Sequence, residues 1–193
     1  MKNKTLIKTN LAMMVALGML AGAANAAVTT KAITLGWAGT IPSAPSVTGD
    51  WKFVDILTGA DYVPNTGKLD INNGSTVGTK SLVMDDFQFG IKATTGTLKA
   101  ASKINAYLAF PVTFTGLNAT SPTAVAPSAS LTANGVALSV GAANAATLTT
   151  IGATPTQDAI PVSVAGKGVL PLNSFSAGDS VSVNATVMFS AEV

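Results

Sequence analysis

The sequence predicts an all-β protein, built as one β-sandwich that follows a leader of 26 residues. Several segments alternate apolar and polar residues with a period of two, which is typical of half-buried strands. Gly, Pro and Asn recur between these segments as turn signals, and few runs have the spacing of an amphipathic helix. Short strands separated by frequent turns favour a sandwich.

Residues 1–26 have the pattern of a secretory signal peptide. Three lysines precede an apolar run from Leu11 to Ala23, and Ala24-Asn25-Ala26 supplies the small residues of a cleavage site. The apolar run is too short to cross a bilayer, which takes about 20 residues. We therefore expect an exported protein whose mature chain starts near Ala27.

The mature N-terminus alternates as a strand would. Thr29, Lys31, Ile33, Leu35 and Trp37 share one face, and Val28, Thr30, Ala32, Thr34 and Gly36 share the other. Residues 27–32 are small and polar, so two interpretations stay open. They form either a disordered tail or a strand that adds to an exposed sheet edge in another molecule.

Two further apolar series lie in the middle of the chain. Phe87, Phe89 and Ile91 alternate behind Asp85-Asp86, and we expect the two acids to point to opposite faces. A longer series runs on alternate positions through Ile104, Ala106, Leu108, Phe110, Val112 and Phe114. Pro111 lacks an N–H, so it demands a bulge or an unpaired neighbour within that series.

The sequence signals for the turns between these segments differ in how specific they are. Asn134-Gly135 separates two short apolar segments, and both residues tolerate the positive φ of a two-residue hairpin. Residues 115–128 and 141–157 are predicted to be long connections or poorly patterned edges. Within the second, residues 141–146 are rich in Ala and offer a helical turn as an alternative.

The C-terminus is predicted to be a half-buried strand that runs to the last residue. Its apolar face contains Val181, Val183, Ala185, Val187, Phe189, Ala191 and Val193. Chain ends usually fray unless something holds them. The strand belongs either to an ordinary complete sheet or to a sheet edge that another strand covers.

The composition excludes several classes of function. The chain has no His and no Cys, which excludes imidazole catalysis, thiol nucleophiles, disulfides and nitrogen or sulfur metal sites. All eleven basic residues are lysines, and three lie in the leader, so residues 27–193 carry eight against nine acids. With no arginine and no basic cluster, we expect no nucleic-acid partner. We predict no catalytic, cofactor or metal site, and no enzyme activity.

Three segments near the mature N-terminus resemble a known family. Residues 35–45 (LGWAGTIPSAP), Trp51-Lys52-Phe53-Val54 and residues 64–71 (PNTGKLDI) are similar to the opening of major pilins of chaperone/usher fimbriae. The match is to the cysteine-free colonisation-factor type, the coli surface antigens. It is closest over residues 27–71. Many pilins of the wider superfamily have a penultimate Tyr, and this chain has Glu192 in that place.

The resemblance implies an incomplete immunoglobulin-like sandwich that lacks its last strand. Residues 1–26 would be the signal peptide, 27–36 a donor-strand extension and 37–193 the pilin domain. The donor residues would be Val28, Thr30, Ala32, Ile33 and Leu35, with the face that fills the groove left open. The acceptor groove would be lined by Val181, Val183, Val187, Phe189, Ala191 and Val193.

The same resemblance implies a structural major subunit of an adhesive surface fimbria. Its partners would be identical subunits in a helical filament, a periplasmic chaperone, an outer-membrane usher and a host-cell surface receptor. The subunit would pass through the periplasm to the cell surface. The alternative is a minor or tip adhesin of the same fimbria, although tip adhesins usually add a receptor-binding domain.

Overall fold

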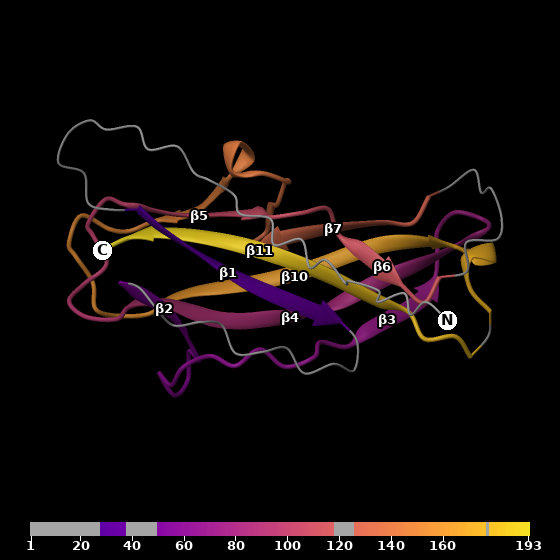
Figure 1. Ribbon diagram of the computed structural model, residues 1–193, viewed down its shortest axis with the longest axis horizontal. Coiled ribbons are helices and arrows are strands. Elements are labelled where there is room, and N and C mark those ends of the chain that lie inside the picture. Colours follow the sequence, from indigo (N-terminus) through magenta and orange to yellow (C-terminus); the bar gives the residue numbers. More distant parts are fainter. Residues whose placement is uncertain (1–27, 38–49, 118–125, 177) are drawn as a thin grey trace, which may run out of the picture.

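The protein is a sandwich of two antiparallel β-sheets, which confirms the predicted fold class (Figure 1). The computed structural model describes residues 28–37, 50–117, 126–176 and 178–193. The predicted signal peptide lies outside these residues. In the described part the only helical elements are two 3-10 turns, η1 (Ala142–Asn144) and η2 (Leu172–Ser174).

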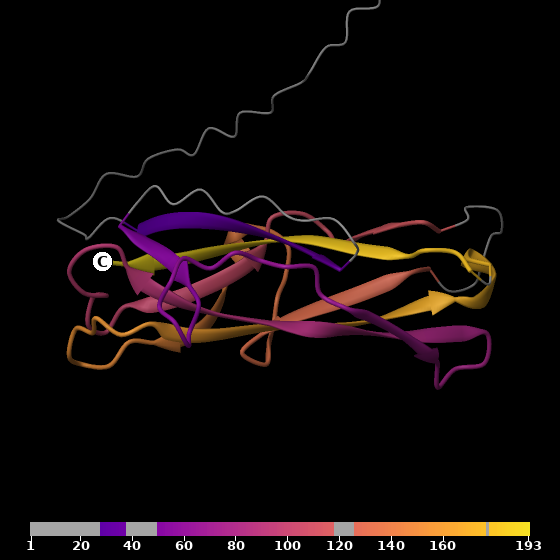
Figure 2. The same ribbon diagram turned by 90° about the horizontal axis from the view of Figure 1, so that it is seen from below.

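The strands divide between the two sheets as follows. The first sheet has the order β1 (Val28–Trp37), β11 (Ser182–Glu192), β5 (Lys103–Leu108) and β9 (Ala146–Thr150), with β6 (Thr113–Thr115) also paired to β11. The second sheet has the order β2 (Trp51–Val54), β4 (Thr79–Ala93), β10 (Ile160–Pro171), β7 (Ser128–Ala133) and β8 (Val136–Ala137), with β3 (Leu69–Asn73) also paired to β4. Figure 2 shows the two layers, with β1 and β11 in the upper one.

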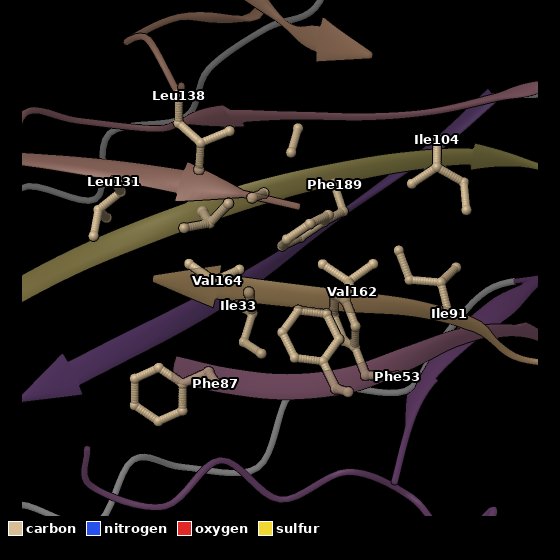
Figure 3. Packing of buried hydrophobic residues seen from close by; sticks show 14 of the residues in the cluster. Ile33, Phe53, Phe87, Ile91, Ile104, Leu131, Leu138, Val162, Val164 and Phe189 are labelled. Carbon is tan, nitrogen blue, oxygen red and sulfur yellow. The ribbon is translucent and has the colours of Figure 1, made fainter. Parts of the chain in front are cut away.

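Aromatic rings from both sheets form the centre of the core. Phe189 of the first sheet meets Phe53 and Phe89 of the second at centroid distances of 5.6 and 5.5 Å. All three contacts within this trio are edge-to-face, the arrangement that ring quadrupoles favour. Figure 3 shows Phe53 and Phe189 among the aliphatic side chains that surround them. The two sheets are therefore held together largely by apolar burial.

A β-bulge in β4 changes which residues face this core. Opposite β10, the two residues Asp85 and Asp86 occupy the space of the single residue Ala165. The large buried apolar side chains have even numbers before the bulge (Leu82, Met84) and odd numbers after it (Phe87, Phe89, Ile91). Gly166 lies beside the bulge, where Met84 and Leu131 fill the space that a side chain would need.

The bulge also corrects the prediction that Asp85 and Asp86 point to opposite faces. Both residues are exposed. The Asp85 carboxylate accepts the backbone N–H of Lys68 at 3.1 Å, and the Asp86 carboxylate accepts the Ser163 hydroxyl at 3.4 Å. Alternation fails here because it holds only while each residue has one partner across the ladder.

The predicted series from Ile104 to Phe114 is interrupted at Pro111. β5 ends at Leu108 and β6 begins at Thr113, and Phe110 between them is 68% exposed, so the series is not one continuous buried face. Proline has a fixed φ and no N–H for the ladder, so the strand stops there. Both pieces still pair with β11, and the Ala109 N–H donates to the Thr186 carbonyl between them.

The predicted hairpin is confirmed. Asn134 and Gly135 both have positive φ, at 48° and 78°, and they join β7 to β8 with Ala133 paired to Val136. The region 141–157, predicted to be a connection or an edge, contains the single turn η1 and the edge strand β9. Of the connection predicted at 115–128, residues 118–125 lie outside the described residues.

We predict that deleting Asp86 unfolds the sandwich. Removing one residue of the bulge restores strict alternation, so either Leu82 and Met84 or the Phe87–Ile91 row must face solvent. Exposing two or three such side chains costs about 1.5–3 kcal/mol each, a large share of a domain's stability. Asp86→Ala keeps the bulge and is the control. Circular dichroism melting measures both, and a deletion variant as stable as Asp86→Ala would contradict the account.

Candidate functional site

The candidate site is the long edge of β11 on which β1 lies. β1 pairs antiparallel with β11 over its whole length, from Val28 opposite Glu192 to Trp37 opposite Val183. In the described part of the chain β1 has no other strand partner, and it ends the first sheet. The N-terminal strand thus fills, within its own chain, the β11 edge that β5 and β6 leave open.

The β11 side of this site has the predicted inward face. Val183, Ala185, Val187, Phe189 and Ala191 are buried, while the residues between them are half-buried. Val181 and Val193 lie just outside the strand and pack, half-buried, against the core. The alternation predicted for the C-terminus is confirmed, and the last strand is held because it has neighbours on both edges.

Over residues 30–33 of β1, the odd-numbered positions turn inward. Ile33 is 1% exposed and belongs to the hydrophobic core, whereas Thr30 and Ala32 are exposed. Among the predicted donor residues, the structure therefore brings Ile33 to the β11 groove and leaves Thr30 and Ala32 outside it. For Val28 and Leu35 the structure describes the backbone but not the side chain.

Lys31 is the unexpected member of the inward face. It is only 9% exposed, and its Nζ lies 5.0 Å from the centre of the Trp51 ring and donates to the Trp51 carbonyl oxygen. In return, the Trp51 indole N–H donates to the Thr29 carbonyl oxygen at 3.2 Å. Burial lowers the pKa of Lys31, and the charge of Asp50 partly opposes this shift. These contacts join β1 to β2, across the two sheets.

Sequence reasoning missed the contact between Trp51 and Lys31. Trp51 is fully buried and meets Phe53 edge-to-face at 5.3 Å. The available signal was a lysine in a row that continues with the apolar residues Ile33, Leu35 and Trp37. A charge in that position needs a partner, because burying it alone is costly. Twenty residues separate Lys31 from Trp51, so local pattern alone does not identify the partner.

A second surface feature is a depression of about 610 Å³ beside the loop that follows β2. Its carboxylates already have structural partners: one Asp55 oxygen accepts from Thr58, and Asp61 pairs with Lys52 at 2.6 Å. Burial, together with the charge of Asp55, raises the pKa of Tyr62 in its wall to about 12. The phenol therefore stays protonated at neutral pH.

The described residues hold neither a cluster of metal-ligating side chains nor a candidate membrane helix.

The fold and this edge define a two-sheet β-sandwich protein in which the N-terminal strand supplies the last partner of the C-terminal strand. Over its whole length the chain is similar to a CS5 fimbrial subunit of Escherichia coli, with 28% identity in an alignment of 211 positions that covers 100% of both chains. This homologue confirms the resemblance to fimbrial pilins, and the chain shares the cysteine-free composition expected of that type. No family model and no solved structure matches.

We predict that Phe189→Asp prevents stable folding. The ring is fully buried between Phe53 and Phe89, so the substitution leaves a cavity and an unpaired charge. The cavity alone costs about 3–5 kcal/mol, and the buried charge adds to it. Ser190→Asp places the same charge on the outward face of β11 and is the control. Soluble yield and thermal melting measure both, and a Phe189→Asp protein as stable as the control would show that this face is not a core.

Proposed function

We propose that the protein is a structural major subunit of a surface fimbria, polymerised by exchange of its N-terminal strand. In the fibre, β1 of one copy pairs with β11 of the next. The observation that carries this proposal is the β1–β11 ladder, in which the N-terminal strand is the sole cover of one whole edge of β11 among the described residues. The fimbrial homologue supports the same function.

The geometry of β1 suits exchange between copies. Trp51 contacts the beginning of β1 through Thr29, while β1 ends at Trp37, eight residues further along. At about 3.3 Å per residue these two points are some 25 Å apart. The twelve residues 38–49 that connect the strands can span about 40 Å when extended. The connection is thus longer than the distance that it must bridge within one chain. The extra length would let β1 reach a second molecule and form the same contacts there.

Exchange of this kind produces an open filament. Each copy donates one surface, β1, and receives on a different one, the β11 edge. Such a heterologous contact repeats head to tail, and it forms a helical fibre when the rotation between copies does not close a ring. When β1 leaves β11, the long unpaired edge makes the free subunit prone to aggregation.

For the route to the surface, we propose the one that the resemblance to pilins implies. Residues 1–26 act as a signal peptide, and a periplasmic chaperone covers the β11 edge until an outer-membrane usher adds the subunit to the fibre. The finished fimbria supports attachment to host surfaces. The fimbrial name of the homologue supports a cell-surface location.

We predict that moving β1 to the C-terminus yields a monomer that cannot polymerise. Val28 lies opposite Glu192, so a copy of residues 28–37 added after Val193 through a short Gly-containing turn can pair with β11 as a hairpin. Residues 27–37 are deleted from their natural place. Because the donor is then tethered at high effective concentration, the groove is filled within one chain.

Size-exclusion chromatography and negative-stain microscopy of the exported proteins measure the outcome. The natural chain should give fibres and the rearranged chain a stable monomer. A third chain, with Ile33→Asp in the moved copy, is the control and should be unstable, because its donor cannot fill the groove. Fibres from the rearranged chain as abundant as those from the natural one would contradict strand exchange.

A further inference from the structure

We propose that Lys31 is the specificity-determining residue that fixes the register of β1 on β11, because Trp51 offers its ammonium group a partner in one register only. The inference deepens the proposed function, since the same contact would select the register of a neighbour's strand in the fibre. It rests on three contacts on the inward side of β1: the Lys31 donation to the Trp51 carbonyl, the position of Nζ 5.0 Å from the Trp51 ring centre, and the bond from the Trp51 indole to Thr29.

The apolar contacts of β1 do not by themselves choose one register. A slip of one residue is excluded, because it would turn Ile33 to the solvent face. A slip of two residues keeps the inward face inward and changes only which inward residue meets which position on β11. Val183, Val187 and Ala191 offer apolar contact at several such positions, and the outward side chains Thr30 and Ala32 are small and exposed.

The charge of Lys31 distinguishes these registers. A slip in one direction places Lys31 where Ile33 now lies, opposite Val187, in the apolar core. A slip in the other direction places it opposite Ala191, at the present position of Thr29. Either slip removes Nζ from the carbonyl oxygen and ring face of Trp51. In the core an ammonium group without a partner is strongly disfavoured, and at the half-buried position of Thr29 it would lose both of its Trp51 contacts, so the charge acts against both wrong pairings.

Such a residue contributes specificity without necessarily contributing stability. Replacing a buried charge by an apolar side chain of similar volume is often neutral or stabilising, because desolvation of the charge is avoided. Lys31 is such a buried charge, and its burial lowers the pKa of the ammonium group. Lys31→Met therefore should keep the fold and lose the register preference, which separates the two roles.

Disulfide trapping measures the register directly, because the chain has no cysteine of its own. Ala32 lies opposite Met188, and slips of two residues would place it opposite Thr186 or Ser190. Three full-length chains carry Ala32→Cys with Met188→Cys, Thr186→Cys or Ser190→Cys. Directly opposed residues in an antiparallel pair are close enough for a disulfide to form. The yield of each disulfide after export reports the population of each register.

In the natural background we expect the 32–188 disulfide to exceed the other two by about tenfold or more, from the strength of a desolvated cation–π contact. Lys31→Met should bring the three yields within about threefold of one another, from loss of that contact. Lys31→Arg retains a cation for the ring and should keep the preference. Lys52→Met, which removes a lysine paired with Asp61 away from β1, is the matched control and should also keep it.

Trp51→Phe tests the same contact by changing the partner of Lys31. It removes the indole N–H and weakens the ring's attraction for the ammonium group, so it should also reduce the preference for the 32–188 disulfide. If both Lys31→Met and Trp51→Phe keep the natural preference, Lys31 does not set the register. Denaturing gels separate disulfides within one chain from those between chains. Bonds within chains alone would contradict strand exchange and leave the assignment of Lys31 intact.

Discussion

The constraint on which the rest of the structure depends is the pairing of β11. This strand supplies the inward row that includes Phe189, and it has β5 and β6 on one edge and β1 on the other. Backbone N–H and C=O groups at a buried edge must find partners. The N-terminal strand is therefore part of the core of the sandwich, and Ile33 is as deeply buried as Phe189. Removal of β1 would leave both an open ladder and an open groove.

The same constraint relates the fold to assembly. Because β1 pairs with β11 alone among the described strands, another copy would supply this pairing with little change in the receiving sandwich. The inward face of β1 combines an apolar anchor, Ile33, with a charged one, Lys31. Ile33 would provide affinity, and Lys31 would fix the register. In coiled coils a single polar residue likewise fixes the alignment of the helices.

Several features could be predicted from the sequence because they depend on local pattern. The alternation of Val183, Val187 and Phe189 predicted the inward face of β11. The pair Asn134-Gly135 predicted the hairpin turn between β7 and β8. Other features depend on partners far away in the chain. The bulge at Asp85-Asp86 is visible only once β10 is placed opposite β4. The contact between Lys31 and Trp51 likewise requires the two sheets to be assembled, and so does the choice of the inward face of β1.

The most direct test of the account is whether β1 and β11 that pair in the fibre come from different copies. Two full-length chains are co-expressed, one with Ala32→Cys alone and the other with Met188→Cys alone, at positions that lie opposite each other in the ladder. Strand exchange predicts disulfide-linked dimers that contain one chain of each kind and that derive from the fibres. Fibres that form normally but contain no such 32–188 disulfide between chains would contradict the central claim.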